Sequence, residues 1–361
     1  LNRGASMQKM SPFLDSTPLV GDGDALRERL DCDGYLFVRE LLPRKDVIRV
    51  QRRLLQKASK GGWLDPTTSF EEGIANNKAA CKDPEEAYMK VFPALWNDEE
   101  LHRLRTHSRI LEFFDLIFGE ATLAHPTFVQ RNIFPRRADF DFTTQPHQDK
   151  PNIGGDTNYA LWSPLGDCPI EKGSLAVSAG SHKYGVLDIK VSSGAGGMEI
   201  AVPIPGKWVT GPFSAGDVLI FSDETVHKAM PNQTTELRQS FDARYQPASH
   251  TICENQLVPY PGCGSWNKVY EGWRHKDQQY YWEKFSLKTA PLDRSVYEAR
   301  DQMAFKMAEN GEVECRDTLL RIVQRDKNSE KVKKAQALLL KLNLASGTNG
   351  DSLSLTAATT Q

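Results

Sequence analysis

The stretch AGDVLIFSDETVHKAMPN, residues 215–232, decides the fold class of this 361-residue chain. Ala215 and Gly216 form a turn signal, and the compact apolar run that follows them, residues 217–221, predicts a buried strand. A polar turn then leads to residues 226–230, which predict a second short strand.

Similar short runs occur on both sides of this stretch, separated by Pro, Gly, Asn and Asp. Together they give about eight short strands, which predicts a sandwich or jelly roll. We therefore predict a mainly β fold with flanking α-helices: a double-stranded β-helix, the jelly roll of cupin-like proteins. The further predicted strands are residues 122–133, 143–148, 159–163, 174–177, 207–209 and 239–245.

The flanking segments have helical or loop character. Pro43 opens a predicted helix whose buried stripe is Val47, Val50 and Leu54. Residues 61–92 are polar and predict a long loop or lid, and residues 97–118 predict one helix capped by Asn97. A glycine-rich insertion, residues 183–206, is placed to cover a cavity mouth.

The chain divides into four predicted segments. Residues 1–24 are an irregular lead-in without periodicity. Residues 25–265 form the catalytic domain with its N-terminal helices. Residues 266–344 are a helical, charged C-terminal extension, and the Ser/Thr/Gly-rich residues 345–361 predict a disordered tail.

Composition excludes several classes of function. A net charge of −2 argues against general nucleic-acid binding. The basic run at residues 44–53 is interpreted as the solvent-exposed face of a helix. No apolar run reaches the roughly 18 residues of a membrane span. Six cysteines without a CxxC motif favour reduced thiols and an intracellular, cytoplasmic protein. Because the chain begins at Leu1 rather than Met, organelle targeting stays an alternative, and the sequence does not predict an oligomeric state.

A histidine and an acidic residue two positions apart occur twice, at His147 with Asp149 and at His275 with Asp277. The second pair lies in a polar stretch with no histidine after it. The first pair ends a predicted strand, where residues i and i+2 point to the same face and can bind one ion. His227, at the start of the strand formed by residues 226–230, is the best third ligand.

Two histidines and one carboxylate form a facial triad, which leaves three positions open on an octahedral ion, as in Fe(II) oxygenases. A 2-oxo acid would occupy two of them and O2 the third. The far carboxylate of that acid needs a buried cation, and an arginine suits it because its planar fork matches a carboxylate. Arg238 follows His227 by eleven residues, and Ser240 lies on the same strand face.

Several blocks of the chain, in order, resemble the phytanoyl-CoA dioxygenase (PhyH) family of Fe(II)/2-oxoglutarate-dependent oxygenases. The resemblance spans about residues 25–247. Two departures affect loop stiffness: Ala179 replaces the proline of the family's PGSH motif, and Lys172 replaces the asparagine of its Asn-Gly turn. The matching blocks are residues 33–43 (DGYLFVRELLP), 147–149 (HQD), 173–182 (GSLAVSAGSH), 215–232, 238–240 (RQS) and 244–245 (RY).

The resemblance implies that His147, Asp149 and His227 bind Fe(II), and that Arg238, assisted by Ser240, binds 2-oxoglutarate. It also implies cosubstrate contacts from Gln130 and Asn132 and a cavity wall at Trp162. Asp149 stands where halogenating relatives have Gly or Ala, which favours hydroxylation, or desaturation or cyclisation, of a C–H bond. The implied coproducts are succinate and CO2.

The implied substrate is a small molecule, anionic or zwitterionic, of the kind met in specialised metabolism. Arg131, Arg136, Arg137, Lys150 and Arg244 lie near the predicted site in sequence, where they could face such a substrate or solvent. Two other functions stay open at this point: a non-catalytic, metal-binding cupin-like module, and a zinc hydrolase with the same ligands. The presence of Arg238 argues against the first, since a pure metal module does not need it.

Overall fold

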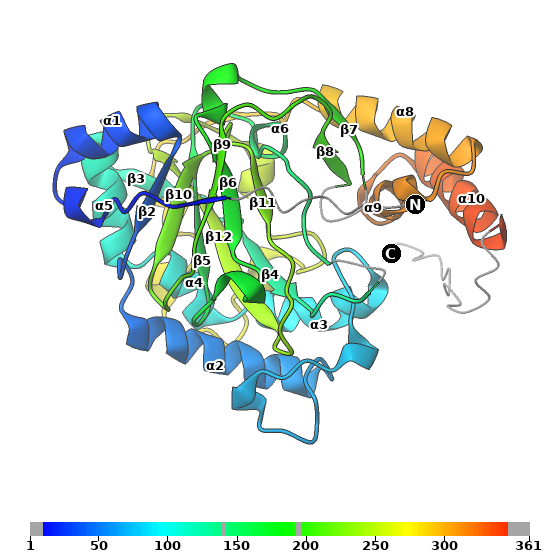
Figure 1. Cartoon of the computed structure of the whole chain (residues 1–361), viewed down its shortest axis with the longest axis horizontal. Coiled ribbons are helices and arrows are strands. Elements are labelled where there is room, and N and C mark those ends of the chain that lie inside the picture. Colours follow the sequence, from blue (N-terminus) through cyan, green and yellow to red (C-terminus); the bar gives the residue numbers. More distant parts are fainter. Residues whose placement is uncertain (1–9, 139–141, 193–196, 346–361) are drawn as a thin grey trace.

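The computed structural model describes residues 10–138, 142–192 and 197–345, and two facing β-sheets form its centre (Figure 1). The larger sheet has the order β2-β10-β5-β12-β3, with β4 also paired to β12, and the smaller has the order β1-β9-β6-β11. This arrangement confirms the predicted jelly roll. The strands of the larger sheet are β2 (Tyr35–Val38), β3 (Thr122–Ala124), β4 (Val129–Ile133), β5 (Tyr159–Pro164), β10 (Val218–Ser222) and β12 (Arg238–Pro247). Those of the smaller sheet are β1 (Ser11–Pro12), β6 (Leu175–Ala179), β9 (Lys207–Thr210) and β11 (His227–Ala229).

Apolar side chains fill the space between the two sheets. Phe221 and Trp162 from the larger sheet and Val177 from the smaller are each no more than 2% exposed. The predicted strand at residues 217–221 is therefore buried on both faces, because its other face packs against helices. Two further pairs lie outside the sheets: β7 (Ile189–Val191) with β8 (Met198–Ile200), and β13 (Thr251–Cys253) with β14 (Lys288–Ala290).

N-terminal helices cover the outer face of the larger sheet. Pro43 precedes α2 as predicted, and Val47, Val50 and Leu54 on that helix are completely buried. The basic residues of α2 are largely matched by carboxylates, for example Arg53 with Asp98 and Arg52 with Glu71. The helices of this layer are α1 (Gly23–Asp33), α2 (Arg44–Lys60), α3 (Glu86–Trp96), α4 (Glu99–Arg105) and α5 (Ser108–Phe118).

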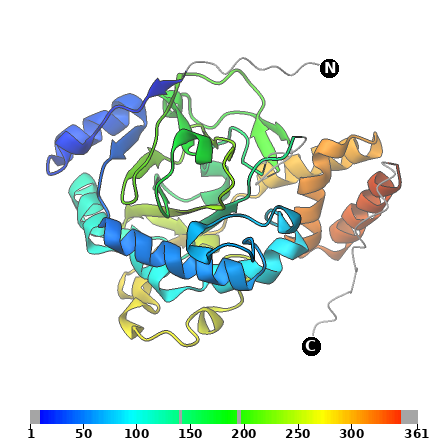
Figure 2. The same cartoon turned by 60° about the horizontal axis from the view of Figure 1, so that its bottom comes forward.

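Three C-terminal helices lie on the side of the molecule opposite α1 in both views (Figure 1, Figure 2). They are α8 (Ser295–Glu309), α9 (Arg316–Arg325) and α10 (Ser329–Ala345). Their apolar side chains form a separate cluster, which includes Leu319 and also Val191 of β7. The segment just before them, with α7 (Trp266–Val269), packs on the main core instead. The four-segment division stays a prediction, and the predicted tail lies, from residue 346, outside the described residues.

Several predicted elements were wrong in detail. The predicted helix at residues 97–118 is two helices, and Asp98 rather than Asn97 caps the first of them. The predicted loop at residues 61–92 ends in α3. Residues 143–148 pair with another strand only at His147, and the insertion at residues 183–206 contains β7 and β8. Short helices complete the fold: α6 (Lys150–Ile153), η1 (Thr17–Leu19), η2 (Phe70–Glu72), η3 (Asn77–Ala79), η4 (Ile170–Lys172), η5 (Ser181–Tyr184), η6 (Glu254–Gln256), η7 (Lys276–Gln278), η8 (Tyr281–Lys284) and η9 (Val313–Cys315).

No helix in the described part of the chain is both long and apolar enough to cross a lipid bilayer.

Candidate metal centre and adjoining cavities

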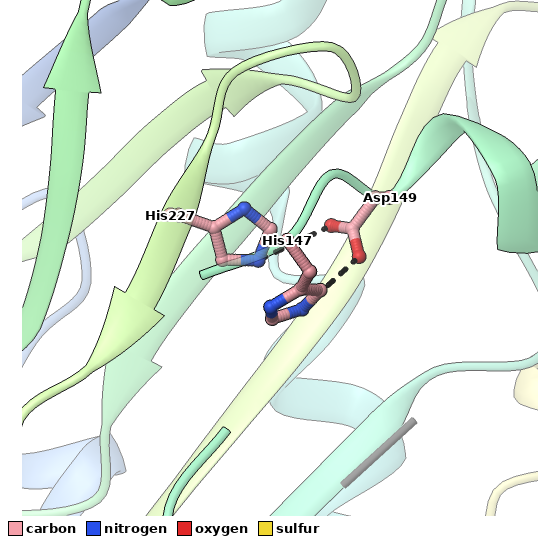
Figure 3. A group of neighbouring side chains, drawn as sticks. All are labelled: His147, Asp149 and His227. Carbon is pink, nitrogen blue, oxygen red and sulfur yellow. Dashed lines mark ion pairs between the residues drawn. The ribbon is translucent and has the colours of Figure 1, made fainter. Parts of the chain in front are cut away.

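Backbone pairing brings the two predicted histidine ligands together. The amide of each donates to the carbonyl of the other at 3.0 Å, which joins the irregular segment before α6 to the start of β11. The imidazole rings lie 4.2 Å apart between centroids, and Asp149 faces them (Figure 3). One β-bridge thus brings together two histidines that are 80 residues apart in the sequence.

Hydrogen bonds determine which ring nitrogens are available to a metal. Nδ1 of His147 donates to the carbonyl of Gln145 at 2.7 Å, and Nδ1 of His227 donates to the carbonyl of Thr225 at 3.1 Å. A carbonyl only accepts, so each Nδ1 carries a proton, which leaves Nε2 as the ring nitrogen that can bind a metal. Such a bond to the second nitrogen is what orients metal-binding histidines.

Asp149 completes a group that fits a metal ion. Its Oδ1 lies 4.0 Å from Nε2 of His147 and its Oδ2 lies 3.8 Å from Nε2 of His227. These separations are too long for hydrogen bonds but short enough for one shared ion. Among the described residues searched, these three are the group of His, Cys, Asp and Glu able to hold a metal, with ligand atoms within 4.8 Å of one another.

The protonation states also suit a cation. Burial lowers the pKa of His147 to about 3, and the neighbouring His227 acts in the same direction, so its imidazole stays neutral. Burial would raise the pKa of Asp149, but the positive charge of Arg244 holds it below its ordinary value. Two imidazoles and one carboxylate are a donor set that Fe(II) oxygenases use.

Behind the candidate ligands, Arg244 forms ion pairs with Asp149 and Asp242, a role that the sequence analysis did not assign to it. Nη2 of Arg244 donates to Oδ2 of Asp149 at 2.7 Å, and the same guanidinium is paired with Asp242. Arg244 is only 3% exposed. A signal for this role was available, since positions 238, 240, 242 and 244 alternate onto one face of β12.

Arg238 lies on that same inward face, at the wall of a small cavity beside the histidines. The cavity has a volume of 40 Å³ and is lined by Arg238, Trp162, His147 and His227. Nη1 of Arg238 donates to Oγ of Ser240 at 2.6 Å, and its guanidinium lies 5.7 Å from the centre of the Trp162 ring. The neighbouring carboxylates have other partners: Glu236 is paired with Lys172, and Asp242 is paired with Arg244.

Gln130 and Asn132 point the other way. Asn132 is in register with Gln239, and Arg131 with Ser240, so the inward residue of β4 is Arg131. The two amides bond to each other, at 2.7 and 3.0 Å, and Gln239 donates to Asn132 at 2.9 Å. Asn132 still reaches the edge of the small cavity. Cosubstrate binding by this pair stays a prediction.

A larger cavity of 330 Å³ opens on the other side of the candidate ligands. His147 and Arg131 line both cavities, so the two spaces meet at the candidate metal centre. Residues of α8 and α9, such as Tyr297 and Arg321, form the far wall, and Met198 of β8 adds to it. The volume falls at the lower end of the range of about 300–1,000 Å³ for small-molecule pockets.

The other histidines have structural surroundings. His102 and His125 are buried and hydrogen-bonded to Trp96 and Gln246. His275, the second histidine with an aspartate two positions on, is paired with Glu99 on the surface. None of these three histidines belongs to the candidate metal group found among the described residues. The nearby basic residues Arg136 and Arg137 are exposed.

Comparisons with known proteins point to one family. The family model described as phytanoyl-CoA dioxygenase (PhyH) matches residues 30–240. The chain is 30% identical over 272 residues to 1-deoxypentalenic acid 11-beta-hydroxylase of Streptomyces exfoliatus, covering 70% of this chain and 91% of that protein. It is 26% identical over 205 residues to phytanoyl-CoA dioxygenase domain-containing protein 1 of Mus musculus, covering 53% of this chain and 69% of that protein.

Solved structures with a similar arrangement include the epimerase SnoN in complex with Fe3+, alpha ketoglutarate and nogalamycin RO. The TM-score is 0.49 at 23% identity, over 67% of this chain and 91% of that one. The non-heme monooxygenase ThoJ has a TM-score of 0.46 at 17% identity, over 88% of this chain and 99% of that one. The family match covers more than half of the residues and includes all three candidate ligands. The chain therefore belongs to the phytanoyl-CoA dioxygenase (PhyH) family of Fe(II)- and 2-oxoglutarate-dependent oxygenases.

Proposed function

We propose that this oxygenase hydroxylates a C–H bond of a small organic acid in the 330 Å³ cavity, with Fe(II) bound by His147, Asp149 and His227. The observation that carries the proposal is the pair of cavities that meet at the candidate ligands. One contains Arg238, whose guanidinium suits the far carboxylate of 2-oxoglutarate. The other is large enough for a small metabolite.

Each protein group has a separable task in this proposal. Fe(II) bound there would supply O2 activation and C–H oxidation, coupled to the conversion of 2-oxoglutarate to succinate and CO2. The Nδ1–H bonds of the two histidines hold their Nε2 atoms toward the ion. Arg238, with Ser240, anchors the far carboxylate of 2-oxoglutarate, and the buried surroundings keep that ion pair away from water.

Two observations favour hydroxylation of an acid over other outcomes. Asp149 keeps a carboxylate at the position that halogenating relatives leave empty. The relative from Streptomyces exfoliatus is named for hydroxylation of an acid, 1-deoxypentalenic acid. Desaturation or cyclisation would use the same protein groups and differ only in the fate of the substrate radical.

Arg238 also separates this proposal from the two alternatives considered from the sequence. A non-catalytic metal module or a zinc hydrolase has no use for a buried arginine beside its ligands, whereas a 2-oxo diacid does. We further propose a cytoplasmic location, which the six unpaired cysteines support because cytosolic thiols stay reduced.

The test is a screen for succinate release. The purified protein with Fe(II) and 2-oxoglutarate is supplied in air with a panel of small acids and their neutral analogues, including 1-deoxypentalenic acid. We expect succinate formation that requires both O2 and iron and that one acid stimulates, with a hydroxylated product. Metal-dependent hydrolysis without O2, or the absence of 2-oxoglutarate binding, would contradict the proposal.

A further inference from the structure

One corner of the large cavity carries more positive than negative charge. Asp83, from the segment before α3, contacts three guanidinium groups: Arg325 at 2.7 Å, Arg321 at 3.3 Å and Arg131 at 3.9 Å. All four side chains line the large cavity. We call these four residues the cationic corner. One carboxylate against three guanidinium groups leaves two positive charges unbalanced among them.

No nearby pair removes this excess. Asp242, which also lines the cavity, is paired with Arg244, and Asp301 and Asp326 both contact Lys331. Tyr260 donates a hydrogen bond to Asp83 at 3.1 Å and carries no charge. Within the described residues, the cationic corner is therefore the part of the cavity wall where an anion would find uncompensated partners.

Burial makes the excess costly unless an anion balances it. Arg321 is 8% exposed, and its Nε has no hydrogen-bond partner among the described residues. Its pKa is lowered, first by burial and then by the charges of Arg325 and Arg131. Burial would raise the pKa of Asp83, yet the three arginines lower it to about 2, so it stays ionised. A buried, incompletely paired guanidinium is typical of a binding site rather than of a stabilising core.

The rest of the cavity wall combines apolar side chains with charged pairs such as Arg300 with Asp301. Ile153, Met198, Leu292 and Ile322 line it together with Tyr297. The cavity therefore offers an apolar surface and one cationic corner, and Arg131 of that corner also lines the small cavity beside the candidate metal centre. A ligand complementary to both features has an apolar part and an acidic group.

We propose that the cationic corner binds the acidic group of the substrate, a carboxylate on a partly apolar body. This inference rests on the proposed function and adds to it the group that the enzyme recognises. Arg321 and Arg325 come from α9, which lies beyond the residues that the family model matches. The C-terminal helices thus supply the specificity of this chain, while the jelly roll supplies the chemistry.

The test compares three ligands of eight carbon atoms each: octanoate, octylphosphonate and the neutral octanamide. Each is titrated into the anaerobic protein loaded with Fe(II) and 2-oxoglutarate, and the Kd is measured by calorimetry. We expect octanoate to bind about tenfold or more tightly than octanamide, because a charge-assisted pair would be formed. Tighter binding of octylphosphonate than of octanoate would assign the corner to phosphate-like groups and overturn the carboxylate proposal.

Variants identify the residues responsible. Arg321→Gln and Arg325→Gln should each raise the Kd of octanoate toward that of octanamide and leave the Kd of octanamide unchanged. Arg316→Gln is the matched control, because this residue lies on the same helix and is exposed. If octanoate and octanamide bind alike, or if the variants affect both equally, the cationic corner is only a structural ion-pair network.

A further measurement separates this inference from the proposed function. The absorption of the anaerobic Fe(II)–2-oxoglutarate complex reports whether the cosubstrate binds. A wild-type protein without that absorption would contradict the proposed function. Arg321→Gln protein with normal absorption, an unchanged Tm and lost preference for octanoate would support the inference alone. Should Arg321→Gln fail to fold, the Arg325→Gln variant and the comparison of ligands on the wild type still decide it.

Discussion

The candidate metal centre and the cationic corner differ in how their charges are balanced. At the metal centre, Arg244 lies between Asp149 and Asp242, and the imidazole of His147 is neutral. At the cationic corner, three arginines share Asp83. The difference indicates that the metal centre needs a divalent cation to complete it, whereas the cationic corner needs an anion. The predictions below test whether the two regions are separate in the way that this contrast implies.

The largest effect is expected at the metal centre. His147→Ala removes one of three ligands, so Fe(II) binding and succinate formation should both be lost, as iron titration and a turnover assay would measure. His275→Ala is the matched control, because that histidine also has an aspartate two positions on but lies on the surface with Glu99. Equal loss in both variants, or full activity in His147→Ala, would remove the basis for the assignment.

A smaller effect is expected from Arg238→Ala. Loss of a buried charge-assisted pair should raise the KM for 2-oxoglutarate roughly 10- to 100-fold, with little change in Fe(II) affinity. Arg238→Lys keeps the charge but loses the planar fork and should be intermediate. An unchanged KM for 2-oxoglutarate would mean that the cosubstrate binds elsewhere.

Arg244→Gln should weaken the centre through Asp149 rather than by removing a ligand. Loss of such an outer contact typically costs about 10- to 100-fold in metal affinity, which a competition titration with a chelator would measure. Arg244→Lys should restore part of the affinity, since it keeps a positive charge beside the carboxylate. If both variants bind iron as the wild type does, the ion pair serves folding only.

Leu319→Ala tests the independence of the C-terminal helices. Leu319 is completely buried in their cluster, so the free energy of unfolding of that region should fall by about 2–5 kcal/mol. Fe(II) affinity should be unchanged. Leu340→Ala, at an exposed position of α10, is the control for calorimetry. Parallel loss of stability and of iron binding would show that the two regions are one unit.

The smallest effect is expected from Gln130→Ala. Its amide bonds to Asn132 on the face of β4 opposite Arg131. The KM for 2-oxoglutarate should therefore change little, whereas the Tm should fall because a buried amide partner is lost. A large rise in KM would support the cosubstrate role implied by the family resemblance.

Strand patterns predicted the jelly roll, and short motifs predicted the candidate ligands. The strand alternation expected at residues 143–148 is not what brings the ligands together, because His147 lies in an irregular segment joined to β11 by one bridge. His147 and Asp149 are two residues apart, and Arg238 follows His227 on the next strand. The inward face of β4 could not be predicted, because alternation alone does not say which set of residues points toward the site. The register against β12 decides that.

The cationic corner was not predictable from the sequence for a different reason. Asp83, Arg131, Arg321 and Arg325 come from three separate regions of the chain, and no local pattern links them. The sequence analysis placed Arg131 near the site, but the residues next to it in the sequence do not indicate that Asp83 is its partner. Only the packing of α9 against the segment before α3 brings these charges together.

The separate apolar cluster of the C-terminal helices has a consequence for enzyme engineering. Val191 of β7 belongs to that cluster, and Met198 of the paired strand β8 lines the large cavity. The strand pair β7–β8 therefore connects the three helices to the cavity, and we expect it to be exchanged together with them. Such an exchange should change the substrate specificity and leave the metal centre intact. An exchange of the helices alone would disrupt their packing against Val191.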